Sequence, residues 1–80
     1  MIKRIVTYDV KDGNDYTDFY EIVDKYDAEE LTESTYVFNT SLSQEEFESL
    51  LAKVFSRGDL VFMISVNSST HKLFYKKITI

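Results

Sequence analysis

The chain has no cysteine and no proline, and only two of its 80 residues are glycine. The absence of cysteine excludes disulfides and thiolate metal sites. Gly13 and Gly58 both fall in short polar stretches, so we expect each to mark a turn. A chain of this length predicts one small domain, residues 1–80, of a size that often gains stability from a metal or from oligomerisation.

Long apolar runs are also missing. No segment approaches the roughly 18 apolar residues needed to cross a bilayer. Residues 1–10 show neither the apolar core nor the small-residue cleavage site of a signal peptide. We therefore expect a soluble, cytoplasmic protein with no membrane partner.

Positive charge is scarce in the first half of the chain. The net charge is −5, and residues 9–33 contain only two bases, Lys11 and Lys25. The basic footprint of most nucleic-acid-binding proteins is therefore missing. Because runs of like charge usually stay in water, the stretch predicts a solvated acidic face. Its ten acids are Asp9, Asp12, Asp15, Asp18, Glu21, Asp24, Asp27, Glu29, Glu30 and Glu33.

Two segments carry a helical pattern of apolar residues at i, i+3, i+4 and i+7. We expect the first helix to begin at a cap provided by Asn14 or Asp15. Ser43 and Glu46 have the spacing of a capping box at the start of the second helix. The stripes are Tyr16, Phe19, Tyr20 and Val23 in the first helix, and Phe47, Leu50, Leu51 and Val54 in the second. Both stripes predict core-facing residues.

The segments between these helices favour extended chain. We expect strands at residues 3–10, 31–39 and 60–66, and a last strand at 72–80 whose lysines suit a sheet edge. The predicted fold class is α+β. The plan is close to a ferredoxin-like β-α-β-β-α-β sheet with two helices on one face and an appended C-terminal strand.

The segment LVFMISV, residues 60–66, shows no polar alternation. A strand with helices on one face and water on the other should alternate. We therefore expect this strand to be buried on both faces. Two short helices cannot cover both sides of the sheet, so the pattern predicts a two-fold homodimer packed through the sheet.

Chemistry-bearing residues are few. The single histidine, His71, stands in a polar loop with no positioned partner. Carboxylates suit Mg²⁺ or Mn²⁺, and Asp9 is the best candidate because it follows an apolar strand. Asp12 and Asp15 are close to it in sequence but lie in a loop. The alternative is that Asp9 simply caps the turn that follows it.

Four segments together resemble a known family. They are TYDV at residues 7–10, DYTDFYEIVDKY at 15–26, ESTYVFNTSLSQEEFESLLAKV at 33–54 and DLVFMISV at 59–66. They resemble the small CRISPR-associated adaptation protein, the second Cas protein, and its SinR-like and VapD-type relatives. Asn14, Tyr16 and Tyr20 fit the pattern N-x-Y-x-x-x-Y, which looks nearest to the SinR-like branch.

The resemblance implies a ferredoxin-like homodimer whose last strand packs against the sheet of the partner. The family's strand-one aspartate matches Asp9, which in members described as metal-dependent nucleases faces its mate across the dimer and binds Mg²⁺ or Mn²⁺. Adaptation proteins carry arginines after this aspartate, whereas this chain has KDGND at residues 11–15. That departure disfavours DNA binding.

Three functions are consistent with these observations. The first is a non-catalytic, protein-binding or scaffold dimer of a defence or toxin–antitoxin type system, with the acidic first helix as the contact surface. The second is a metal-dependent endoribonuclease in which Asp9 carboxylates from both subunits hold one metal ion. The third is an acidic mimic of nucleic acid, suggested by the acids spaced three residues apart between positions 9 and 27.

Overall fold

The computed structural model describes residues 2–67, 69–70 and 72–80. His71 lies outside these residues. The elements follow one another as β1 (Ile2–Asp9), α1 (Thr17–Lys25), β2 (Glu29–Thr32), β3 (Thr35–Thr40), α2 (Gln44–Val54), β4 (Leu60–Asn67) and β5 (Lys72–Lys77). The fold class is therefore α+β, as the sequence predicts.

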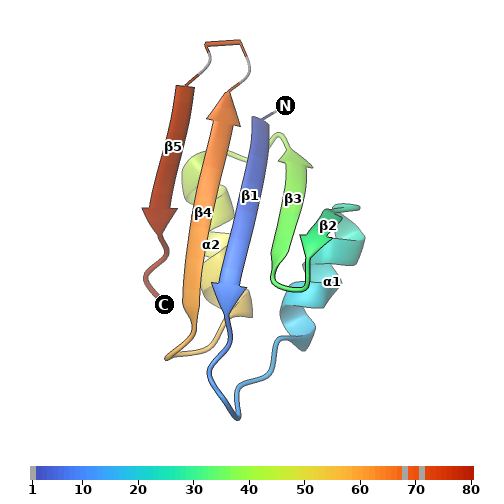
Figure 1. Ribbon diagram of the computed structural model, residues 1–80, viewed down its shortest axis with the longest axis vertical. Helices are drawn as coiled ribbons and strands as arrows, with labels where there is room; N and C mark the ends of the chain where they lie inside the picture. The colour runs from blue at the N-terminus through green and yellow to red at the C-terminus, as the bar shows by residue number, and fades with distance from the viewer. Residues whose placement is uncertain (1, 68, 71) are drawn as a thin grey trace.

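The five strands form one antiparallel sheet in the order β2-β3-β1-β4-β5 (Figure 1). β1 is the central strand. It pairs with β3 on one side, for example Val6 with Tyr36, and with β4 on the other, Val6 with Met63. Each helix therefore connects two strands that have another strand between them.

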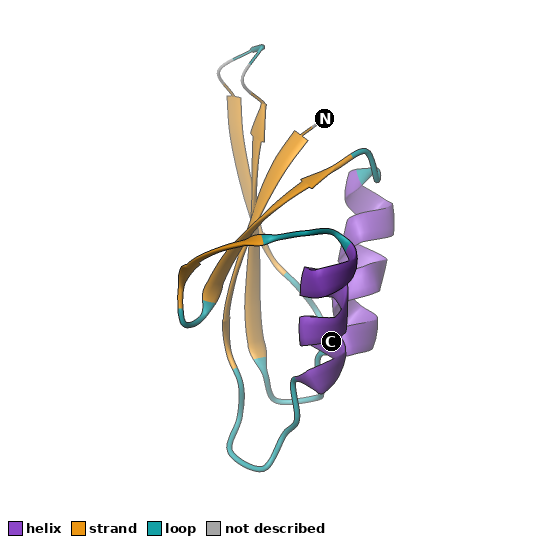
Figure 2. Cartoon of the chain, turned by 90° about the vertical axis from the view of Figure 1, so that its right-hand side faces the viewer, coloured by secondary structure: helices purple, strands orange, loops and turns teal. Residues whose placement is uncertain are grey.

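Both helices pack on the same face of the sheet (Figure 2). The core lies between these two layers and is rich in aromatic rings. Phe19 from α1 and Phe47 from α2 are fully buried against the sheet, and the ring of Phe38 lies 5.3 Å from that of Phe47 and 6.0 Å from that of Phe19. The fully buried strand residues beside them are Val6, Phe38, Val61 and Met63.

The two helices begin in different ways. α2 starts with the predicted capping box: the Ser43 hydroxyl accepts a hydrogen bond from the Glu46 amide at 3.1 Å, and the Glu46 carboxylate accepts one from the Ser43 amide at 3.0 Å. α1 starts at Tyr16 without a side-chain cap. Asp15, one residue earlier, instead accepts hydrogen bonds from the amide and hydroxyl of Thr17. The prediction that Asn14 or Asp15 is the N-cap residue is therefore wrong.

One predicted strand is two strands. Residues 31–39 contain a tight turn at Glu33 and Ser34, which joins β2 to β3 as an antiparallel hairpin. The single-strand prediction is wrong here because the turn contains no glycine, proline or asparagine. The last strand is also shorter than predicted, since β5 ends at Lys77. Ile78, which follows it, is buried, and its amide donates a hydrogen bond to the Val61 carbonyl at 2.8 Å.

β5 occupies one edge of the sheet and pairs with β4 of its own chain, for example Tyr75 with Ile64. The predicted edge position of the C-terminal lysines is confirmed. Among the residues that the structure describes, no helix is long and apolar enough to span a membrane.

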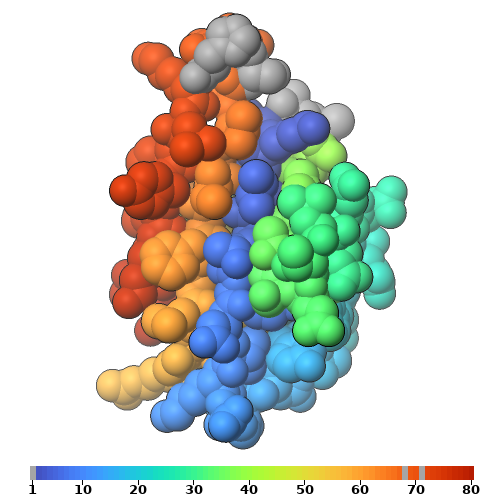
Figure 3. All heavy atoms as spheres, in the orientation of Figure 1, coloured from blue at the N-terminus to red at the C-terminus, as the bar shows by residue number. Residues whose placement is uncertain are grey.

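Among the described residues, no helix or strand covers the face of the sheet opposite the helices (Figures 2 and 3). Large apolar side chains are exposed there. Along β4, Val61 and Met63 point to the helices and are fully buried, whereas Leu60 and Phe62 point the other way and are 45% and 39% exposed. In a single chain this side is uncovered, so burial of 60–66 on both faces stays a prediction that requires a second copy. We call this uncovered side the open face, with Ile5, Phe62, Ile64, Leu73 and Tyr75 at its centre.

Candidate functional site

Asp9 is the last residue of β1 and is exposed. It pairs across the sheet with Leu60, and its side chain belongs to the open face because it alternates with the buried side of the strand. Beside it is a small hollow of about 170 Å³, which Thr7, Leu60 and Phe62 also line. The candidate carboxylate therefore borders the surface that the sequence predicts to be a dimer interface.

The loop after β1 is held by a different carboxylate, Asp59. Its Oδ1 accepts bonds from the Lys11 amide and the Asn14 side-chain amide, both at 2.8 Å, and its Oδ2 accepts one from the Ser56 amide at 2.8 Å. Burial by itself would raise the pKa of Asp59, but the bonds from Asn14, Ser56 and Lys11 outweigh it and the pKa is lowered. Within the described residues Asp9 makes no side-chain hydrogen bond, so Asp59 does the capping that the sequence could also assign to Asp9.

The other acids of this loop do not join Asp9. Asp15 turns to Thr17, whose hydroxyl and amide lower the pKa of Asp15. Asp12 is exposed. No group of three or more histidine, cysteine, aspartate or glutamate side chains converges as a metal site in residues 2–67, 69–70 and 72–80. A metal held by two Asp9 side chains requires a second copy of the chain.

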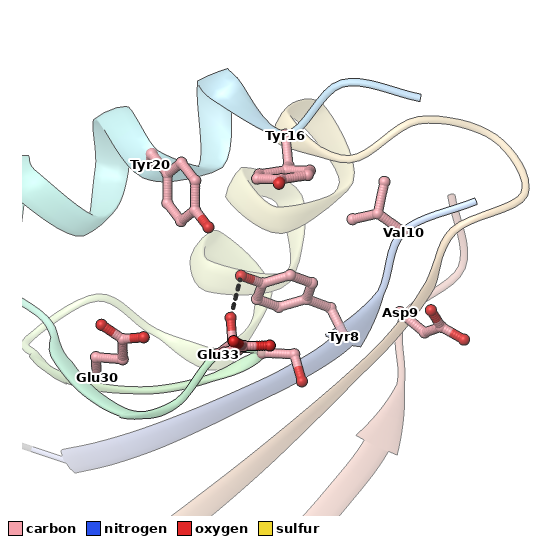
Figure 4. Close-up of a pocket in the computed structure, with 8 residues that line it drawn as sticks. Tyr8, Asp9, Val10, Tyr16, Tyr20, Glu30 and Glu33 are labelled. Atoms are coloured by element: carbon pink, nitrogen blue, oxygen red, sulfur yellow. Dashed lines mark hydrogen bonds between the residues drawn. The ribbon is translucent and has the colours of Figure 1, made fainter. Parts of the chain in front are cut away.

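A second, larger hollow lies on the helix side of the same strand end. It measures about 640 Å³ and lies between β1, the start of α1 and the β2–β3 turn. Figure 4 shows Tyr8, Tyr16 and Tyr20 directed toward one space, while the Asp9 carboxylate points away from them. The Tyr8 hydroxyl donates a hydrogen bond to the Glu33 carbonyl at 3.2 Å. We call this the tyrosine hollow; its lining is completed by Asp9, Val10, Glu30, Glu33 and Ser34.

The tyrosine hollow is rich in oxygen and in aromatic surface. The rings of Tyr16 and Tyr20 meet edge to face at 5.0 Å, and that of Tyr8 stacks on Tyr36 at 6.3 Å. Burial, followed by the nearby Tyr20 hydroxyl, raises the pKa of Tyr8. Burial also raises the pKa of Tyr36, with contributions from Tyr20 and the negative charge of Glu30. These phenols therefore stay protonated at neutral pH.

The prediction that both aromatic stripes face the core is correct for Phe19 and Phe47 and wrong for Tyr16 and Tyr20. Phe19 and Phe47 are fully buried, whereas Tyr16 is 41% and Tyr20 39% exposed. Their hydroxyls explain the difference, because a tyrosine at the rim of a core can keep its polar end in water. The sequence contains a signal for this difference, because the stripe of the first helix includes tyrosines, whereas the only aromatic residue in the stripe of the second helix is Phe47.

The acidic stretch is a solvated surface, as predicted. All ten acids between positions 9 and 33 are exposed. Those spaced three residues apart are divided among β1, the following loop, α1 and the residues after it. They do not form one stripe along a single element.

Comparison of the chain with protein-family models, with curated proteins and with solved structures finds no match. The resemblance to the CRISPR-associated adaptation proteins and their SinR-like relatives therefore depends on the four sequence segments alone.

Proposed function

We propose that this protein is a homodimer, joined through the open face, that acts without catalysis as a protein-binding or scaffold component of a defence or toxin–antitoxin type system. The proposal rests on the presence of two different surfaces on one small domain. One is the uncovered apolar face over β1, β4 and β5, and the other is the exposed acidic surface around α1.

The open face supports the dimer. Leu73 and Tyr75 on β5 are 65% and 72% exposed, and they pair with Val66 and Ile64 on β4. An exposed, contiguous apolar surface of this kind marks an interaction site in soluble proteins. A two-fold axis would pack two such faces against each other at the usual distance of about 10 Å between sheets.

The order β2-β3-β1-β4, with each helix joining strands that flank another, supports a ferredoxin-like fold with β5 appended. We therefore propose a ferredoxin-like fold for this chain. In such a dimer the last strand of each subunit would lie beside the interface, because β5 borders the open face.

Sedimentation equilibrium tests the dimer. We expect a dimer at micromolar concentration and a folded monomer for Phe62→Glu, because the new carboxylate would be buried without a partner. Lys53→Glu is the matched control, since it adds an acid on the exposed side of α2. A monomeric wild-type protein at micromolar concentration would remove the proposal.

Charge tests the protein-binding role. The acids of α1, Asp18, Glu21 and Asp24, are exposed and would attract a basic partner over long distances. Proteins captured on the immobilised dimer should elute near about 0.5 M salt, where exposed charges are screened. Neutralising the three acids should prevent capture of the same proteins. Retention that salt and neutralisation leave unchanged would contradict the role.

A metal-dependent endoribonuclease is the second candidate, favoured by the position of Asp9. Its exposed carboxylate borders the open face, and two like charges brought together there would repel unless a cation lay between them. A shared metal ion would activate water and stabilise charge on phosphate. Incubation with Mn²⁺ and RNA, with DNA in parallel, tests it. Cleavage that Asp9→Asn abolishes supports this function, and cleavage that persists, or none at all, removes it.

A further inference from the structure

We propose that the tyrosine hollow is a binding site for a cationic side chain, and that an arginine of a basic protein partner is its occupant. The role of the hollow rests on the proposed function, because it is there that the partner would anchor to the acidic surface. The open face plays no part in this site, and Asp9, although it lines the edge of the hollow, points its carboxylate away from the three tyrosines (Figure 4).

The polar groups of the hollow are matched to a donor with positive charge. Three phenol oxygens, those of Tyr8, Tyr16 and Tyr20, converge on the space (Figure 4), and the hydroxyl of Ser34 and two exposed carboxylates, Glu30 and Glu33, border it. Every one of these oxygens can accept a hydrogen bond. A guanidinium carries five N–H donors and no acceptor, so it complements such a lining.

The aromatic walls add a second attraction for a cation. Ring faces attract ammonium and guanidinium groups, and clusters of tyrosines with acids recognise organic cations. Tyr16 and Tyr20 stand edge to face at 5.0 Å and keep about two-fifths of their surface open to solvent. They therefore have ring surface available for an incoming side chain. A planar guanidinium stacks on such rings better than an ammonium does.

No cation of the described chain fills the hollow. Lys11 runs in the other direction, where its Cδ approaches Gly58, and Lys25 lies over the ring of Tyr26 at 5.6 Å. The one ion pair among the described residues joins Lys76 to Glu48 on the far side of the molecule. Glu30 and Glu33 are therefore uncompensated beside an aromatic hollow of about 640 Å³.

The test is a titration of ¹⁵N-labelled protein, followed by amide chemical shifts, with N-acetyl-Gly-Arg-Gly-amide. The same peptide with citrulline, which has the shape of arginine without its charge, is the matched ligand control. We expect the arginine peptide to shift the amides around Tyr8, Tyr16, Tyr20 and Glu33, and the citrulline peptide to leave them unchanged. A lysine peptide should bind more weakly than the arginine peptide.

Variants separate the ring from the charge. Tyr16→Ala should weaken the arginine peptide about threefold to tenfold, whereas Tyr16→Phe, which keeps the ring, should change affinity less than about twofold. Glu33→Gln should weaken it about threefold. Glu45→Gln, which removes the same charge from the exposed surface of α2, should have no effect. Tyr16 is exposed, so these variants should remain folded.

Three outcomes would overturn the assignment: equal shifts with citrulline, shifts distributed along the acids of α1 instead of the hollow, or unchanged affinity in Tyr16→Ala. Single-stranded RNA that shifts the same tyrosines more strongly than the arginine peptide would also overturn it. Failure of the proposed function is visible separately. A protein that is monomeric, or captures no partner, while still binding the arginine peptide in the hollow would lose the dimer or scaffold role alone.

Discussion

Both faces of β4 carry large apolar residues, but their surroundings are opposite. Val61 and Met63 are fully buried beneath the helices, while Leu60 and Phe62 on the same strand are about two-fifths exposed. The covered face packs against aromatic rings from α1 and α2, and no element of the described part of the chain covers the open face. A strand with apolar residues on both faces therefore does not by itself indicate which face the chain covers.

A buried ring on the covered face should give the largest effect. Phe38→Ala removes a ring with no exposure, and we expect it to lower the free energy of unfolding by about 3–5 kcal/mol. Phe62→Ala on the open face should cost less than about 1 kcal/mol in dilute solution. Urea unfolding measures both. If the open face joins two chains, the cost of Phe62→Ala must rise with protein concentration.

The two carboxylates at this end of the sheet sharpen the comparison. Asp59→Ala removes three accepted hydrogen bonds from a buried position, and we expect a loss of about 2 kcal/mol. Asp9→Ala on the open face should change stability by less than about 0.5 kcal/mol. Chemical unfolding of both variants and of Asp59→Asn, which should be intermediate, checks the order. Equal losses at Asp9 and Asp59 would contradict it.

The same carboxylate predicts a dependence on pH. The pKa of Asp59 is lowered in the folded state, so its stabilising contribution is present above the unfolded value near 3.8 and is lost as the pH falls through the folded pKa. The stability difference between the wild-type protein and Asp59→Asn should therefore be constant near neutral pH and shrink below about pH 4. A difference that grows on acidification would reverse the assigned sign.

The stability of α2, one of the two helices that cover the core, depends on its N-terminal cap. Ser43→Ala removes one half of the capping box of α2 and should cost about 1 kcal/mol. Ser49→Ala, inside the same helix and exposed, should cost nothing. Thermal unfolding of the two variants measures the difference. Equal melting temperatures would mean that packing alone fixes the start of α2.

The smallest effect is expected on β5, where neighbouring residues point to opposite faces. The Nζ of Lys76 lies 2.6 Å from Glu48 of α2, and the lysine side chain is about half exposed. Lys76→Met should cost about 0.5 kcal/mol, and salt should remove the difference. Tyr75→Ala on the open face should change stability only at concentrations where a dimer forms. A salt-independent loss for Lys76→Met would indicate packing rather than charge.

Much of the fold follows from local patterns. The spacing of Phe47, Leu50 and Leu51 with the Ser43 cap predicts α2 correctly, and the apolar run after Gly58 predicts β4. The hairpin at Glu33 and Ser34 could not be predicted in the same way. Its one turn-favouring residue is Ser34, a weaker signal than glycine or proline, and β2 and β3 are separated because β3 pairs with β1 while β2 pairs on its outer side.

The candidate site was less accessible to sequence reasoning. Asp9 was found because an acid after an apolar strand is visible in the sequence. The sequence does not show that Asp59 holds the loop, because its hydrogen-bond partners there, Lys11 and Asn14, lie 48 and 45 positions away. The tyrosine hollow likewise combines β1, α1 and the β2–β3 turn, and only the tertiary structure brings these together.

The central position of β1 affects how the chain folds while it is being synthesised. β1 is the first of the five strands to be synthesised, yet Lys3–Asp9 must wait for β4 before their second edge is paired. At about 5–20 residues per second, that wait lasts roughly 3–10 s. The β1–β3 pairing can form earlier and shield one edge. For the remaining time, the nascent protein exposes the unpaired edge of a strand that lies at the centre of the finished sheet.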